Sequence, residues 1–281
     1  AGLPVTAGGG DAVIQTTGTG LVRQGVLGVV IGTSGVVAMG LDGFKKNKGG
    51  QLQVFCNNAK HLWHAMGVTL AAGGSYRWYR DTLCKAEMEE AARTGRNVYD
   101  IMGEEAEKVA PGCGGLIFLP YLSGERCPHF DSDARGVFYG LGLEHGKGAM
   151  TRAVMEGVTF SLRDVSERIY AMDASIKPEK VILSGGGAMS PLWRQIVADV
   201  FNLPVVTVSG SGEGGAYGAA LVAGVGVGIW KDLIEASSVL REETRTLPIP
   251  ENVAVYDKTF ALYDKVYLAL KDSFKELSVV R

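Results

Sequence analysis

Asp11 is the only acid or base in the run LPVTAGGGDAVIQTTGTG, residues 3–20, where three glycines precede it and small residues follow. A metal ion needs several oxygen ligands, and no second acid lies nearby in the sequence. None of the four histidines belongs to a recognisable nucleophilic triad motif. A lone carboxylate among glycines fits a general base that takes a proton from a hydroxyl group. A tight turn that ends in an acid is the structural alternative.

A second glycine cluster, IGTSG at residues 31–35, separates two β-branched runs within residues 25–41. These runs predict two strands joined by a polar turn. The hydroxyls of Thr33 and Ser34 and the amides after Gly32 would converge there, and such a concave run of N–H groups suits a phosphate oxygen. An ordinary β-hairpin turn explains the same residues.

Two more glycine clusters stand beside predicted helices. LSGGGA, residues 183–188, follows a predicted strand and precedes a helix for which Ser190 is a plausible N-cap. In α/β proteins, ligands bind at the carboxyl ends of strands, where glycine lets a nucleotide lie against the main chain. In AAGGSYRWYRD, Gly73 and Arg77 lie four residues apart on one helix face. Arg77 could contact a base there, although most surface arginines only stay solvated.

The remaining segments alternate between strand and helix patterns, which predicts an α/β layered fold. Apolar residues recur at helical spacing over 149–172, on one face of a long amphipathic helix, and again from Phe260 to Leu277. No linker divides the chain, so we expect residues 1–281 to form a single domain. Further expected elements are strands at 61–70, 115–122, 136–141, 180–184 and 204–210, and helices at 71–83, 85–112, 190–201 and 213–224.

Composition narrows the class of protein. Hydrophobic residues make up 46% of the chain and charged residues 21%, which excludes disorder. The net charge of -2 provides no field that would attract nucleic acid or an acidic membrane surface. Four scattered cysteines lack CxxC pairing and predict reduced thiols, and no apolar run is long enough to cross a membrane. We therefore expect a cytoplasmic protein.

Read together, these motifs resemble the FGGY carbohydrate kinase family, and its xylulokinase members most of all. The matching stretches occur in the family's order over nearly the whole chain. The loop LPYLSGER followed by ARGVFYGL is the most specific of them. The stretches are AGGGD (7–11), GTSGV (32–36), FLPYLSGERCPHFDSDARGVFYGL (118–141), RAVMEGV (152–158), GGGAMSPLWRQIVADV (185–200) and GAYGAALVAG (215–224).

The resemblance implies an actin-like ATPase, ribonuclease-H-like lobe with a mixed sheet flanked by helices. By position, Asp11 matches the catalytic base, which also contacts the sugar. Further matches are a phosphate-binding loop and a set of adenosine contacts. The phosphate loop comprises Gly32, Thr33 and Ser34, and the adenosine contacts are Gly73, Arg77, Gly186, Gly187 and Ser190.

The family's reaction is the ATP-dependent phosphorylation of a sugar hydroxyl, with Mg²⁺ arriving on the ATP phosphates. The resemblance implies D-xylulose as the sugar, with gluconate, glycerol or another ketose as alternatives. It also implies an N-terminal sugar-binding lobe, so this chain matches the C-terminal half. A nucleotide-binding module without catalysis is the alternative for the isolated chain, and a homodimer stays open.

The loop SGERCPHFDSDAR, residues 123–135, has two interpretations. It could line the cleft between the lobes. Equally, Glu125, Arg126 and Asp133 could form an internal salt-bridge network that orders the loop. His129 is expected to order the loop through a hydrogen bond.

Overall fold

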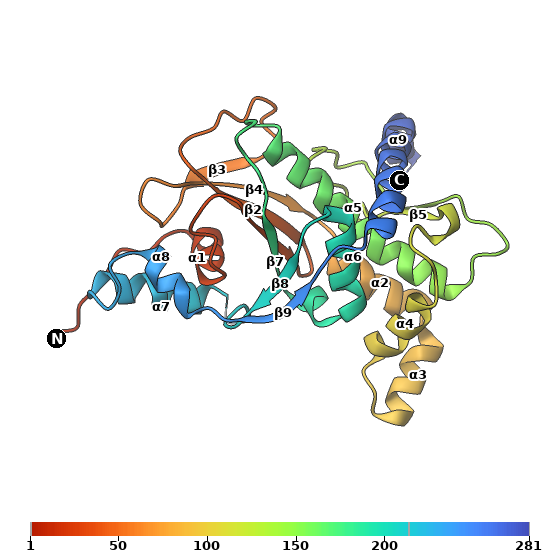
Figure 1. Ribbon diagram of the computed structural model, residues 1–281. Helices are drawn as coiled ribbons and strands as arrows, with labels where there is room; N and C mark the ends of the chain where they lie inside the picture. Colours follow the sequence, from red (N-terminus) through yellow and green to blue (C-terminus); the bar gives the residue numbers. More distant parts are fainter. Residues whose placement is uncertain (1, 213, 281) are drawn as a thin grey trace.

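A computed structural model describes residues 2–212 and 214–280. Its centre is a seven-stranded mixed sheet in the order β3-β4-β2-β1-β7-β8-β9 (Figure 1). Strand β1 pairs antiparallel with β2 and parallel with β7, and β7 pairs parallel with β8. The strands are β1 (Val26–Ile31), β2 (Gly35–Leu41), β3 (Gln53–Cys56), β4 (Trp63–Thr69), β7 (Lys180–Ser184), β8 (Val205–Val208) and β9 (Glu242–Thr246).

Helices cover both faces of this sheet. In Figure 1, α1 and α7 lie on one side of the sheet, whereas α5 and α6 lie on the other. Helix α9 packs against α5 and α6. A two-stranded sheet of β5 (Ile117–Leu119) and β6 (Val137–Tyr139) adjoins α5. The helices are α1 (Asp11–Gly18), α2 (Gly73–Leu83), α3 (Lys85–Thr94), α4 (Val98–Glu107), α5 (Lys147–Tyr170), α6 (Pro191–Phe201), α7 (Gly215–Gly226), α8 (Leu233–Ala236) and α9 (Pro250–Val280).

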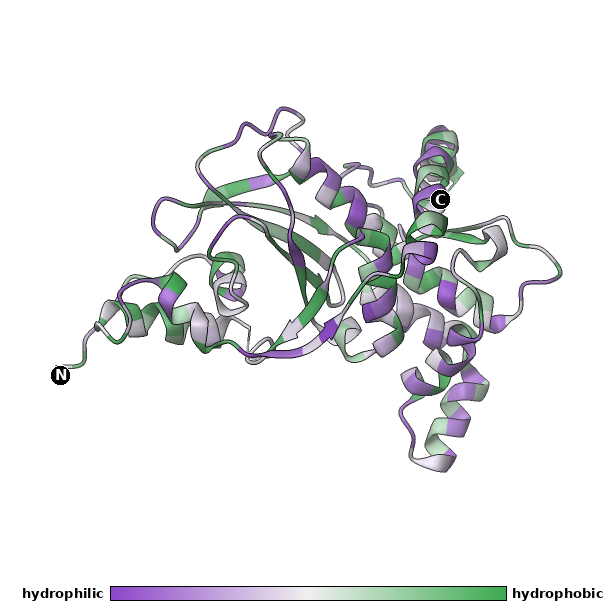
Figure 2. Ribbon diagram, viewed as in Figure 1, coloured by the Kyte–Doolittle hydropathy of each residue, from purple (hydrophilic) through white to green (hydrophobic). Residues whose placement is uncertain are grey.

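The central strands are buried on both faces because each face has its own apolar cluster. On β1, Leu27 and Ile31 belong to the larger cluster under α5 and α6. Val26 faces the smaller cluster on the side of α1. Figure 2 shows these strands as a largely hydrophobic centre. Among the described residues, no helix has both the length and the apolar composition of a membrane span.

Most of the expected elements are present. The two strands within 25–41 form the β1–β2 hairpin, and the helix after Ser190 begins as predicted, with the Ser190 hydroxyl accepting a hydrogen bond from Trp193 N. On the last helix, Phe260, Tyr263, Tyr267 and Phe274 are buried and Leu270 is partly buried, whereas Leu277 is exposed. All four cysteines are free thiols in the described chain.

Two expectations were wrong, and some elements were not expected. Residues 85–112 are two helices and not one, because Gly95 takes the left-handed conformation (φ 73°) that ends α3, and Asn97 caps α4. Helix α5 is buried around most of its circumference, and not along one face, because α4, α6 and β5 also cover it. Elements α1, α8, β3 and β9 were not expected, because none has a clear apolar period.

The loop at 123–135 is not ordered by salt bridges among Glu125, Arg126 and Asp133, which was one of its two interpretations. The Glu125 carboxylate instead accepts hydrogen bonds from the backbone N–H groups of Leu70 (3.0 Å) and Arg126 (2.7 Å). The N–H group of Asp133 donates to a carboxylate oxygen of Asp131. His129 lies 3.1 Å from the Tyr121 hydroxyl, which confirms that it orders the loop through a hydrogen bond.

Candidate functional site

A cavity of about 380 Å³ opens where β1 and β7 end and where α2 and α6 begin. The parallel pairing of β1 with β7 brings these two strand ends together. Strand ends of this kind are the usual ligand sites of α/β sheets. The lining residues are Ile31, Gly32, Thr33, Gly73, Tyr76, Arg77, Asn97, Tyr99, Asp100, Gly186, Gly187, Met189, Ser190 and Trp193.

One wall of the cavity is the β1–β2 turn, held against the start of α2. The N–H group of Gly73 donates to the Gly32 carbonyl (2.7 Å), and that of Gly74 donates to the Thr33 carbonyl (3.0 Å). A Cβ on Gly73 would lie 2.6 Å from the Gly32 oxygen, so only glycine permits this approach. Gly32, Thr33, Gly73 and Arg77 all line the cavity as expected, whereas Ser34 of the same turn does not.

The turn is a β-hairpin turn, and two of its N–H groups remain open to a ligand. Gly32 N–H is already used, because it donates to the Ser34 carbonyl at 3.1 Å. Within the described residues, the N–H groups of Thr33 and Ser34 have no protein acceptor. Arg77 adds a positive charge, and its Nη2 lies 3.5 Å from the Thr33 hydroxyl. This end of the cavity therefore suits an anion.

The opposite wall is the glycine turn after β7. Gly185 has φ 83° and leads into the short 3₁₀ helix η2 (Gly186–Met189). A Cβ on Gly187 would lie 2.5 Å from the Ile31 side chain, so this turn also depends on glycine. Gly186, Gly187 and Ser190, which the resemblance implies as adenosine contacts, all line the cavity.

Between these walls lies an aromatic floor that sequence reasoning missed. The rings of Tyr76 and Trp193 meet edge to face, with centroids 5.2 Å apart, and Tyr76 stacks on Tyr99 at 5.4 Å. A local signal existed for two of them. Tyr76 follows Gly73 by three residues and Trp193 follows Ser190 by three, which places each on the helix face of a predicted residue.

Asp11 does not line this cavity. It is exposed at the first position of α1, where a carboxylate oxygen accepts a hydrogen bond from Ala12 N (2.8 Å). One helical turn further on, Gln15 lines a second hollow of about 760 Å³. This hollow shares Gly186 and Met189 with the first cavity, so the two are neighbours. The carboxylate is therefore open to a ligand and not enclosed in apolar core.

No group of three or more His, Cys, Asp or Glu side chains that could hold a metal ion occurs in residues 2–212 and 214–280. No carboxylate lines the end of the cavity near Thr33 and Arg77, which suits an anion. A divalent cation would therefore fit here only as the companion of a ligand that brings its own oxygen atoms.

Comparison with known proteins identifies the family of the chain. Residues 27–227 match the C-terminal domain of the FGGY family of carbohydrate kinases. Xylulose kinase of Lactococcus lactis is 37% identical over 267 residues, which cover 94% of this chain and 51% of that protein. Gluconokinase of Bacillus licheniformis is 32% identical over 276 residues, covering 98% of this chain and 53% of that protein. The chain thus spans about half the length of the curated relatives it matches.

A solved structure also resembles this chain in fold. The ligand-bound xylulose kinase of Lactobacillus acidophilus superposes with a TM-score of 0.84 at 30% identity, covering 94% of this chain and 51% of that one. The mixed sheet with helices on both faces is accordingly the actin-like fold of these kinases. From the family match over residues 27–227 and this shared fold, the chain belongs to the FGGY family of carbohydrate kinases.

Proposed function

We propose that the chain is the nucleotide-binding lobe of an ATP-dependent carbohydrate kinase. Residues 1–281 would act as one unit beside an N-terminal lobe that supplies most sugar contacts. The observation that carries this proposal is the cavity between the β1–β2 turn and the β7 turn, where seven residues chosen from separate motifs converge. That the relatives are about twice as long supports the second lobe.

The cavity suggests how ATP would lie. Its phosphates would meet Gly32, Thr33, Ser34 and Arg77, the end with free amides and a positive charge. Its adenosine would extend across the aromatic floor. Gly73, Gly186, Gly187 and Ser190 would contact the nucleoside there. Mg²⁺ would enter bound to the ATP phosphates, whose negative charge it neutralises.

Asp11 would act as the general base. Its exposed carboxylate would accept the proton of the sugar hydroxyl, and the hydroxyl oxygen would form a bond to the γ-phosphorus. The bond from that phosphorus to the bridging oxygen would break, and ADP would leave. Glycines before Asp11 leave room for both reactants, since no side chain projects from residues 8–10.

D-Xylulose, phosphorylated to D-xylulose 5-phosphate, is the sugar that we propose. Its support is the 37% identity to a xylulose kinase. D-Gluconate is the second candidate, because a gluconokinase is 32% identical over a similar span. The ratio of kcat/KM for the two sugars, measured on the full-length kinase, decides between them.

The test of the reaction is Asp11→Asn in the full-length protein. We expect kcat to fall by roughly 100-fold or more, because a positioned base contributes about that much. The Kd for ADP should stay within about twofold, since Asp11 lies outside the cavity. The matched control is Asp272→Asn, an exposed acid on α9. Wild-type turnover in Asp11→Asn would remove Asp11 from the reaction, and failure of the wild type to bind ADP would overturn the nucleotide site.

A further inference from the structure

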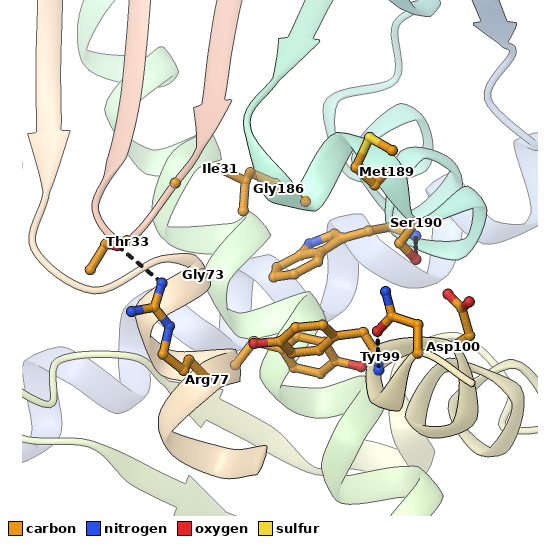
Figure 3. A pocket seen from close by; sticks show the side chains of 14 residues that line it. Ile31, Thr33, Gly73, Arg77, Tyr99, Asp100, Gly186, Met189 and Ser190 are labelled. Atoms are coloured by element: carbon orange, nitrogen blue, oxygen red, sulfur yellow. Dashed lines mark hydrogen bonds between the residues drawn. The ribbon is translucent and has the colours of Figure 1, made fainter. Parts of the chain in front are cut away.

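The cavity is polar at both ends, and the two ends carry opposite charge. Figure 3 shows Thr33 and Arg77 at one end and Asp100 with Ser190 at the other, separated by Ile31 and aromatic rings. Arg77 provides the positive charge, and Asp100 is the only acid among the lining residues. A ligand that fills this cavity must therefore match an anion-binding end, an apolar middle and an acidic end.

Asp100 reaches the cavity from the first turn of α4. Asn97 caps this helix, and its side-chain oxygen accepts the N–H group of Tyr99 (2.9 Å). The Asn97 amide nitrogen and the Asp100 carboxylate have no hydrogen-bond partner elsewhere in the described chain, and both residues line the cavity. An acid in a first helical turn also interacts favourably with the helix dipole. An experiment must therefore compare ligands, because only a change in ligand preference distinguishes ligand recognition by Asp100 from its stabilisation of the helix.

We propose that Asp100 is a specificity residue that selects a nucleobase with an exocyclic amino group. The inference rests on the proposed function, in which the phosphates occupy the Arg77 end, so the base must point to the Asp100 end. There the carboxylate can only accept hydrogen bonds, and an N–H₂ group on the base edge can donate one. Beside it, the free N–H₂ group of Asn97 donates to a ring nitrogen. Adenine presents this pair of groups on adjacent positions.

The probes are ADP and purine riboside 5′-diphosphate, which differ only in the amino group at position 6 of the base. Isothermal titration calorimetry of the wild-type chain should give ADP a Kd roughly tenfold lower, because a hydrogen bond to a charged group contributes about that factor. In Asp100→Ala the two Kd values should become equal within about twofold, mainly through weaker ADP binding. The matched control, Glu107→Ala, changes an exposed acid on the same helix outside the cavity and should keep the tenfold ratio.

Arg77→Ala tests the orientation of the ligand. It should weaken binding of both diphosphates by the same factor and leave their ratio unchanged. Equal affinity of the wild type for the two diphosphates, or an unchanged ratio in Asp100→Ala, would overturn the selection by Asp100 while leaving nucleotide binding intact. If neither diphosphate binds, the nucleotide site itself fails and the inference fails with it.

Discussion

Glu125 holds a carboxylate inside the protein with backbone amides as its hydrogen-bond donors. Among the described residues it has no ion pair, and only 3% of its surface is exposed. Burial raises its pKa from 4.5 to about 7, more than the N–H groups of Arg126 and Leu70 lower it. The folded protein therefore keeps this proton over a pH range in which the unfolded chain loses it.

This raised pKa predicts a loss of stability with rising pH. Between about pH 4.5 and 7 the folded state binds more protons than the unfolded state, so the free energy of unfolding falls as pH rises, and the penalty is complete above pH 7. Between pH 5 and pH 8, we expect the free energy of unfolding of the wild type to fall by roughly 1–3 kcal/mol more than that of Glu125→Gln. Urea unfolding of both proteins at pH 5 and pH 8 measures this difference.

The control is Glu107→Gln, an exposed acid that should keep the wild-type pH dependence. Identical pH dependence in wild type and Glu125→Gln would contradict a protonated Glu125 in the folded state.

How much of the site follows from sequence depends on whether its signals are local. Gly73, Gly186 and Ser190 each lie in a strand–turn–helix sequence pattern that can be recognised from the local segment alone. Asn97 and Asp100 belong to a charged helical segment with no such signal, and they meet the cavity only because α4 packs against α5. Site residues without a local signal can be identified only from the tertiary structure.

At the scale of elements, α1 and α7 cross with their backbones in contact. A Cβ on Gly18 would lie 2.7 Å from the Gly214 carbonyl oxygen, and a Cβ on Gly218 would collide with the carbonyl oxygen of Ile14. Because α1 begins with Asp11, this crossing fixes where the proposed base lies.

We expect Gly218→Ala to destabilise the chain by roughly 1–3 kcal/mol, since the new methyl group must push α1 away from α7. In the full-length kinase, the displaced Asp11 should also lower kcat. Gly215→Ala is the control, because its Cβ would lie an ordinary 3.9 Å from the Ile14 side chain. Chemical denaturation and steady-state kinetics measure both effects. Equal stability of the two variants would show that α1 can move away from α7 at little cost in free energy.

The elements themselves were predictable where apolar residues recur at a regular period. The β1–β2 hairpin, α2 and α6 have such patterns and their own turn or cap residues. Strand β9 has the sequence EETRT, with no apolar residue, and is a strand because it pairs with β8. Helix α1 is only eight residues long, with Val13 and Ile14 as its buried apolar side chains, and its place depends on contact with α7.

For the whole molecule, a buried polar network ties three distant segments together. Arg152 on α5 donates to Glu156 (2.8 Å), to the Tyr256 hydroxyl on α9 (2.9 Å) and to the Val109 carbonyl after α4 (2.8 Å). Tyr256 in turn donates to Glu156 at 2.7 Å. The network therefore joins α9 to the helix layer beside the cavity.

Tyr256→Phe should lower the free energy of unfolding by roughly 1–3 kcal/mol, because it leaves a buried cation and a buried carboxylate each short of one partner. Tyr139→Phe, an exposed tyrosine on β6, should change it by less than about 0.5 kcal/mol. Urea unfolding curves compare the two variants. Equal stability would mean that water replaces the lost hydroxyl.

Strand β9 forms one outer margin of the sheet, beyond β8. Glu242 on this strand pairs with Lys180 (2.9 Å) and Arg245 (2.8 Å), and Glu243 beside it is exposed. An open margin invites strand addition by a neighbouring molecule, and charged side chains oppose that addition. The same charged residues that gave β9 no apolar pattern therefore oppose edge-to-edge pairing with another molecule.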